Sequence, residues 1–254
     1  MRQEILHLHK IIQTGYIGFE KNGGAEYDPN VAFYSGKTGK AVLQQNQVPY
    51  DYLQTNVAQE LASEMSPEQD KTTSLMFGIQ WDLICKYLEE KSELEQTDIN
   101  ENSKSWGNYT TSTITLNRGK YLLWQFSDLD DSELAKVAVW KEHNEDYIYS
   151  EDEETTITLV KDSVKNSNTE GIDVYLTTGA SEQTKKMNIY DFAGNGFEWT
   201  LEEYDGLPVI RGGIDSLVSN LEGTACASFR HYTACYYGWE YYNNIPINWR
   251  PTMY

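Results

Sequence analysis

The stretch of sequence that decides the fold is residues 188–200, which read Asn-Ile-Tyr-Asp-Phe-Ala-Gly-Asn-Gly-Phe-Glu-Trp-Thr. Three shorter motifs follow it, Val209-Ile210-Arg211-Gly212-Gly213, Ser228-Phe229-Arg230 and Trp249-Arg250-Pro251. This part of the chain is dense in Gly, Trp, Tyr and Asn, and its short apolar runs are separated by turn residues. Such a pattern favours a fold rich in loops and short strands, held together by aromatic packing.

Outside this region the sequence predicts a mixture of helices and strands. The expected helices lie over 1–14, from Thr55 onward, over 74–90 and around 134–140, and the expected strands over 16–19, 120–126 and 155–160. The first turn of the helix at 74–90 could instead be extended. Residues 89–104 are polar and acidic and are expected to form an exposed loop. We interpret residues 110–170 as a variable insertion in a single domain that spans 1–254.

The totals exclude several classes of protein. The chain has 254 residues and a formal net charge of −19, with 39 acidic and 20 basic residues. Such a balance argues against binding nucleic acid or anionic membranes, since both would be repelled. The three cysteines are too few and too irregularly spaced for a disulfide framework or a zinc site. No apolar run approaches the ~18 residues of a membrane span, and the first residues lack the apolar core of a signal peptide.

The motifs together resemble the formylglycine-generating-enzyme (sulfatase-modifying factor) family, whose fold is a variant of the C-type lectin domain. Weaker matches precede them in the same order, at Gly15–Glu20, Leu75–Asp82, Ser105–Tyr109 and Thr177–Glu182. The resemblance covers almost the whole chain except residues 110–170. It implies an α+β, C-type-lectin-like fold, loop-rich, with short antiparallel strands and two or more helices.

The residues that carry the family's chemistry are missing. Its enzymes use two cysteines shortly after the Arg-Gly-Gly motif to bind copper(I), which selects soft thiolate ligands. Here that stretch, 214–222, contains no cysteine, and Leu217 and Glu222 stand where the pair would be. Cys226 and Cys235 are out of register and are better explained as small buried apolar residues. The four histidines give no iron-binding set either, so we expect a protein that is not an enzyme. An enzyme with relocated metal ligands remains the alternative.

The same scaffold occurs in bacterial and phage variable proteins of diversity-generating retroelements, which the chain also resembles. In those proteins mutation at adenines of Asn-type codons produces Tyr, Asn, Ser, Ile, Asp and similar residues. Residues 230–248 are rich in Tyr and Asn and lie between the Ser-Phe-Arg and Trp-Arg-Pro motifs. Trp239 and Glu240 are not products of such mutation and are expected to be fixed. The resemblance implies a hypervariable, ligand-binding surface. A structural module of a phage particle is a third interpretation.

The composition of this segment suits binding, because Tyr offers a large contact area with few rotatable bonds and Asn adds adaptable hydrogen bonds. We expect a protein ligand, with a glycan as the alternative. The predicted ligand-binding residues are Ile214, Asp215, Ser216, Leu217, Val218, Tyr232, Tyr236, Tyr237, Tyr241, Tyr242, Asn243 and Asn244. The other interpretation is that these tyrosines are half-buried packing residues. The location is left open between the cytoplasm, a phage particle and display on a surface by another domain.

A calcium site is the second hypothesis, although no cofactor is required for binding. Calcium prefers oxygen ligands, and a tight turn that contains glycine can point carbonyls inward beside carboxylates. By the resemblance, Asp191 and Glu198 would supply side chains and Gly194 and Gly196 would supply carbonyls. The alternative is that Asp191 and Asn195 cap turns, while Glu198 pairs with one of the expected buried arginines, Arg211 or Arg250.

Overall fold

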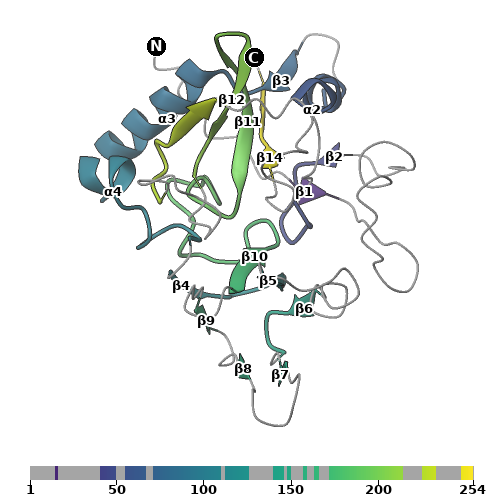
Figure 1. Ribbon diagram of the computed structural model, residues 1–254, viewed down its shortest axis with the longest axis vertical. Helices are drawn as coiled ribbons and strands as arrows, with labels where there is room; N and C mark the ends of the chain where they lie inside the picture. Colours follow the sequence, from purple (N-terminus) through teal and green to yellow (C-terminus); the bar gives the residue numbers. More distant parts are fainter. Residues whose placement is uncertain are drawn as a thin grey trace.

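The computed structural model describes residues 15–16, 41–49, 55–66, 71–109, 112–125, 140–145, 148–149, 157–158, 163–165, 172–213, 225–232 and 247–253. These residues form a few helices and short, mostly antiparallel strands (Figure 1), in agreement with the expected α+β class. The helices are α2 (Thr55–Ser63), α3 (Gly78–Lys91) and α4 (Gln96–Asn100). The strands are β1 (Gly15–Tyr16), β2 (Ala41–Val42), β3 (Thr73–Leu75), β4 (Thr113–Thr115), β5 (Lys120–Gln125), β6 (Lys141–Glu142), β7 (Ile148–Tyr149), β8 (Ile157–Thr158), β9 (Ser163–Lys165), β10 (Ile172–Leu176), β11 (Phe197–Tyr204), β12 (Leu207–Arg211), β13 (Arg230–Tyr232), β14 (Ile247–Trp249) and β15 (Pro251–Met253).

The largest sheet has the strand order β13-β12-β11-β14. β11 and β12 form a hairpin whose turn is Asp205-Gly206, and φ is positive at both residues, 53° and 74°. Asp-Gly is a favoured pair in such a turn because both central positions need positive φ. β13 pairs antiparallel with β12, and β14 pairs parallel with β11. The chain therefore leaves one outer strand of the sheet at residue 232 and re-enters at the opposite outer strand at residue 247.

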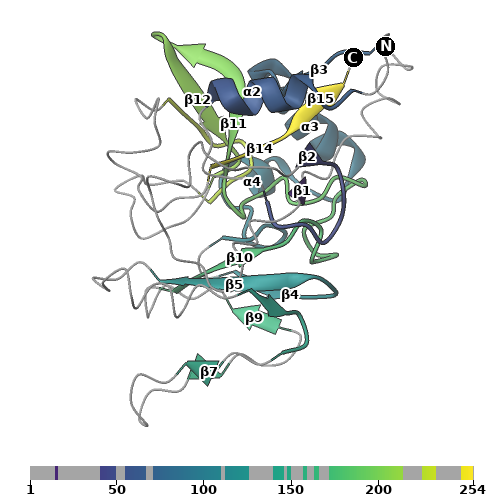
Figure 2. The same cartoon turned by 90° about the vertical axis from the view of Figure 1, so that its right-hand side faces the viewer.

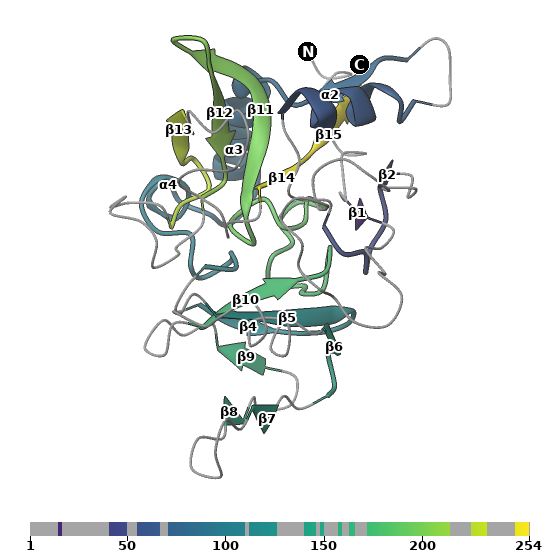
Figure 3. The same cartoon turned by 45° about the vertical axis from the view of Figure 1, so that its right-hand side comes forward.

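One face of this sheet packs against α2. Side chains alternate between the two faces of a strand, so Phe197 and Trp199 share the face of Ile210. They form a buried cluster with Trp249 and with Ala58 and Ala62 of α2. β15 continues this side of the molecule by pairing with β3, and Figure 3 shows α2 beside β15. The C-terminal motif thus contributes directly to the core.

The opposite side of the sheet faces α3 (Figure 1), whose Trp81, Ile84 and Leu88 are buried. The ring of Trp81 stacks on Phe192 with 4.2 Å between ring centroids, and its Nε1–H donates to the carbonyl of Ala227 at 2.8 Å. A large aromatic ring in the core is tolerated best when its polar atom finds a partner, as it does here.

The motifs singled out in the sequence meet in space. Asn108 and Gly194 form a parallel bridge, in which Asn108 N–H donates to the Ala193 carbonyl and Asn195 N–H donates to the Asn108 carbonyl. Gly194 N–H donates to the Gly212 carbonyl at 3.1 Å, and the Tyr109 hydroxyl donates to the same carbonyl at 2.7 Å. The segments 105–109, 193–196 and 211–213 are therefore joined backbone to backbone.

A second sheet, of order β10-β5-β6, lies below the first in Figure 2, with the β4–β9 pair next to it. The side chain of Asn195 links the two regions, because its Oδ1 accepts from Leu176 N–H and its Nδ2 donates to the Leu176 carbonyl. Asn108 Nδ2 donates in the same way to the carbonyl of Val174. Most of the segment read as an insertion lies outside the described residues, and its β4, β5 and β9 pair within this lower region.

The structure corrects some of the expected elements. The segment 74–90 begins as the strand β3, and the helix starts only at Gly78, as the extended alternative proposed. The acidic loop expected at 89–104 is wrong in part, because α3 continues to Lys91 and α4 occupies 96–100. Leu94 and Ile99 of this segment are buried in the core. The helix expected over 1–14 lies outside the described residues.

The predicted strand at 120–126 is confirmed as β5, and a helix does begin at Thr55. A strand was predicted over 155–160, and the part of it that the structure describes, residues 157–158, is the strand β8. The helical patch around 134–140 lies outside the described residues except for Trp140, which is not in a helix. In the part of the chain that the structure describes, no helix has the length and apolar character needed to cross a lipid bilayer.

Candidate functional site

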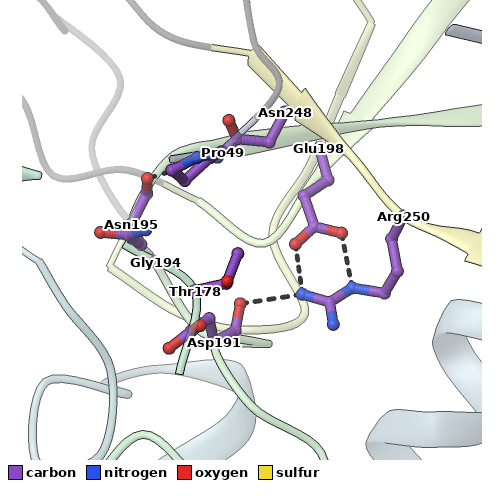
Figure 4. A pocket seen from close by; sticks show the side chains of 8 residues that line it. All are labelled: Pro49, Thr178, Asp191, Gly194, Asn195, Glu198, Asn248 and Arg250. Atoms are coloured by element: carbon purple, nitrogen blue, oxygen red, sulfur yellow. Dashed lines mark hydrogen bonds and ion pairs between the residues drawn. The ribbon is translucent and has the colours of Figure 1, made fainter. Parts of the chain in front are cut away.

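The segment 188–200 contributes half of the residues that line a small pocket. Its lining residues, drawn in Figure 4, are Pro49, Thr178, Asp191, Gly194, Asn195, Glu198, Asn248 and Arg250. They come from loops before β11, from β11 and β14, and from distant parts of the chain. The pocket therefore brings the motif 188–200 and the C-terminal motif 249–251 into contact.

Arg250 forms a two-pronged pair with Glu198. Its Nε donates to Glu198 Oε2 at 2.7 Å and its Nη2 to Oε1 at 2.5 Å, and both side chains are almost fully buried. Nη1 and Nη2 also donate to the carbonyls of Tyr190 and Asp191. This confirms the expectation that Arg250 is a buried structural arginine, and it selects Arg250 over Arg211 as the partner of Glu198.

Burial and charge oppose one another in this pair. Burial raises the pKa of Glu198, and Arg250 opposes the shift by favouring the carboxylate. For Arg250, burial alone would lower the pKa, but the adjacent Glu198 carboxylate outweighs it and the net shift is upward. A buried charge without its partner would be costly, and each side chain favours the charged form of the other.

Asp191 is held by short hydrogen bonds. Gly179 N–H donates to its Oδ2 at 2.6 Å, and Thr184 Oγ1 lies 2.7 Å from its Oδ1. Its φ of 52° places it in the left-handed region, which Asp tolerates better than most residues. Burial raises the pKa of this carboxyl. The predicted role of Asp191 and Asn195 in organising turns is consistent with these contacts.

Three of the four residues proposed for calcium, Asp191, Gly194 and Glu198, line the pocket, but the carboxylate oxygens of Asp191 and Glu198 have other partners. Both oxygens of Glu198 accept hydrogen bonds from Arg250, whose positive charge would repel a cation beside it. Both oxygens of Asp191 are also engaged. Among the described residues there is no group of three or more His, Cys, Asp or Glu placed to hold a metal ion. Calcium stays a prediction, and the observed pairing is the one that the alternative described.

A second charged cluster lies between α3 and the sheet. Arg211 is buried and pairs with Asp82 and with Glu202, whose Oε2 is 3.4 Å from Nη1. Arg230 joins the same carboxylates, with 2.8 Å to Asp82 Oδ2 and 3.0 Å to Glu202 Oε1. Sequence analysis did not assign roles to Asp82 and Glu202. The sequence points to Asp82 and Glu202 only indirectly: two arginines in neighbouring strands require acidic partners, but nothing local says which carboxylates these are.

Of the predicted ligand-binding residues, the structure describes Tyr232. It ends β13 and is 48% exposed, which suits a contact residue. The predicted residues at 214–218, 236–237 and 241–244 lie outside the described residues. Their flanks are described: 214 follows Gly213 at the end of β12, and 247 begins β14 beside the start of β11. The segment that begins at 214 and the segment that ends before 247 therefore meet the sheet at the same end, beside the start of β11.

The described cysteines are buried. Burial raises the pKa of Cys85 to about 12, and it also raises that of Cys226. A thiolate is the form that binds metals or attacks substrates, so neither thiol is activated at neutral pH. Cys226 is thus a small buried residue, as expected. Cys235 lies outside the described residues.

Comparison of the chain with protein-family models, with curated proteins and with solved structures gives no match.

Proposed function

We propose that this protein binds a ligand without catalysing a reaction, and that it displays the Tyr/Asn-rich part of residues 230–248 as a hypervariable surface on a fixed frame. The single observation that carries the proposal is the placement of the two flanks of that segment. β13 and β14 are the two outer strands of one four-stranded sheet. The 14 residues 233–246 thus connect opposite edges of a sheet whose interior is packed core.

The length of the connection supports display. Three strand spacings amount to about 14 Å, whereas 14 extended residues can span about 46 Å. The chain between the edges is therefore several times longer than a direct crossing needs. Its frame is anchored, because Ile247, Asn248, Trp249 and Arg250 are all buried. A fixed frame with a long connection rich in Tyr and Asn is the arrangement that binding loops use.

The lectin-like fold of the formylglycine-generating type, and diversification by a retroelement, belong to this proposal. The fold is supported by the motifs and by the way in which 105–109, 193–196 and 211–213 join. Diversification is supported by the Tyr/Asn-rich composition of 230–248 between two motifs. The absence of cysteine from 214–222 supports binding in place of copper-dependent catalysis. The expected ligand is a protein.

Sequencing the neighbourhood of the coding region tests the proposal. We expect a reverse-transcriptase gene and a near-identical second copy of the codons for 230–248, with mismatches confined to adenines of that copy. The codons of Trp239, Glu240 and Trp249 should match in both copies. A locus with no such copy would overturn diversification. Copper or iron bound by the purified protein at one ion per chain would overturn the non-catalytic assignment.

A further inference from the structure

Two exposed tyrosine rings stand together at the outer part of the large sheet. Tyr204 ends β11 and Tyr232 ends β13, and their ring centroids are 5.0 Å apart with an interplanar angle of 30°. Tyr204 is 62% exposed and Tyr232 is 48% exposed. Two aromatic rings that remain this exposed while in contact with one another offer electron-rich faces to a partner.

The pair is the outer end of a row of rings that begins in the core. Tyr232 stacks on His231 at 5.3 Å, His231 on Phe229 at 6.2 Å, and Phe229 lies 5.5 Å from Phe197, which is buried. Each ring in the row limits the movement of the next. A ring that is already held in place loses little conformational entropy when it binds, so more of the contact energy remains as affinity.

The charges around the pair favour a cation. Asp205 follows Tyr204 in the hairpin turn and is exposed, and Glu203 is exposed on the other face of β11. Neither carboxylate has an ion pair among the salt bridges of the described residues. The neighbouring cation, Arg230, is already paired with Asp82 and Glu202. Aromatic faces attract Lys and above all Arg, and nearby carboxylates strengthen that attraction. The net charge of −19 adds long-range steering of a basic partner.

We propose that Tyr204 and Tyr232 bind an arginine side chain of a partner protein. The binding surface then extends from Tyr232 onto the β11–β12 hairpin, outside the Tyr/Asn-rich segment. This inference rests on the proposed function, since it names the chemistry of the partner for the surface that begins at Tyr232. The two rings themselves lie in strands of the large sheet, Tyr204 in β11 and Tyr232 in β13.

The test is a titration of the full chain with short peptides, followed through the backbone amide signal of Gly206 in the hairpin turn. The probes are acetyl-Gly-Arg-Gly-Arg-Gly-amide and two matched peptides in which Gln or Glu replaces Arg. The arginine peptide should shift the Gly206 signal, and the Gln and Glu peptides should leave it in place. If the Gln or Glu peptide binds as well as the arginine peptide, or if the arginine peptide has no effect at roughly 10 mM, the proposal is overturned.

Variants assign the contact to the rings. Tyr204→Leu with Tyr232→Leu keeps apolar area but removes both aromatic faces, and it should weaken binding roughly fivefold to thirtyfold. Tyr204→Phe with Tyr232→Phe keeps the faces and should bind within about twofold of the wild type. Unchanged affinity in the Leu pair, or equal loss in the Phe pair, would contradict the proposal. Glu203→Gln with Asp205→Asn should weaken binding at low salt and matter little at high salt.

The failure of this inference can be told apart from failure of the proposed function. The Tyr236→Ala/Tyr241→Ala variant should bind the arginine peptide as the wild type does, because it leaves the Tyr204–Tyr232 pair intact. Loss of peptide binding in that variant would overturn the assignment to the pair. The peptide titration therefore tests the arginine site whether or not the locus contains a second copy of the codons for 230–248.

Discussion

Gly194 and Gly206 have almost the same backbone conformation, with φ of 73° and 74°, but different surroundings. A Cβ at Gly194 would lie 2.3 Å from the carbonyl oxygen of Asn108, whereas a Cβ at Gly206 would meet nothing within 4 Å. We expect Gly206→Ala to cost about 1–2 kcal/mol for the left-handed backbone alone. Gly194→Ala should cost about 2–5 kcal/mol, because backbone must also move. Urea denaturation measures both, and equal losses would mean that the segments 105–109 and 193–196 do not interlock.

The Glu198–Arg250 pair should be essential as a pair. Arg250→Met leaves Glu198 buried without a partner, so we expect a loss of about 3–5 kcal/mol in the free energy of unfolding. Glu198→Gln with Arg250→Met should lose less than the sum of the single changes. The matched control is Arg118→Met, which breaks the partly exposed pair with Glu182 and a hydrogen bond to the Gly179 carbonyl, and should cost no more than about 1–2 kcal/mol. Additive losses would show that the two side chains do not act together.

Cys85 makes stability depend on alkaline pH. Its ordinary pKa is 9.0 and burial raises the pKa in the folded protein to about 12. A raised folded pKa gives stability that is complete below the ordinary value and is lost as pH rises towards the folded value. Between about pH 9 and 12 the unfolded state releases a proton that the folded state keeps, which costs about 1.4 kcal/mol per pH unit.

Urea denaturation of the wild type and of Cys85→Ala measures this effect. The advantage of the wild type over the variant should shrink as pH rises above 9. A constant difference between pH 8 and pH 11 would mean that the thiol of Cys85 is not buried as described.

At the level of residues, the sequence predicted well where chemistry left few choices. Buried arginines need carboxylates, so two partners for Glu198 could be named in advance, and the structure selects Arg250. Asp82 and Glu202 could not be named, because α3 and β11 are distant in sequence and only the fold brings them to Arg211. Of the Tyr204–Tyr232 pair, only Tyr232 was predicted to bind a ligand, because the fold alone brings the distant Tyr204 next to it.

At the scale of elements, side-chain amides take the place of a neighbouring strand at β10. Asn195 accepts from Leu176 N–H and donates to the Leu176 carbonyl, at 2.8 and 3.0 Å. We expect Asn195→Gly, which keeps the positive φ available, to lower stability by about 2–4 kcal/mol and to speed hydrogen exchange of the Leu176 amide. Asn117→Gly removes one exposed hydrogen bond to Glu182 and is the control. Unchanged exchange at Leu176 would contradict this role of Asn195.

Elements with strong local signals were predicted from sequence, and those fixed by tertiary contacts were not. The helix predicted over 74–90 has an apolar spacing that can be recognised locally. α4 was missed because its composition is polar, and only Leu94 and Ile99 around it enter the core. The start of α3 at Gly78 is set by the pairing of β3 with β15, at the far end of the chain. The pairing of β13 and β14 with opposite edges of the hairpin likewise depends on the whole fold.

At the scale of the whole molecule, we propose a packed frame that carries a displayed segment. The frame comprises the large sheet with α2 and α3 on its two sides, and the buried Glu198–Arg250 pair joins the motifs 188–200 and 249–251. Residues 233–246 connect its outer strands. If this division is right, substitutions in the frame change stability, while substitutions in the displayed segment change binding.

Thermal unfolding of one multiple variant tests that division most directly. Replacing Tyr236, Tyr237, Tyr241 and Tyr242 together by Ser should shift Tm by no more than about 4 °C, since displayed side chains add little to stability. The frame control, Trp249→Ala, should lower Tm by roughly 6–20 °C, because it empties a buried site. If the four-serine variant instead loses as much as Trp249→Ala, these tyrosines are core residues and the segment is not a binding surface.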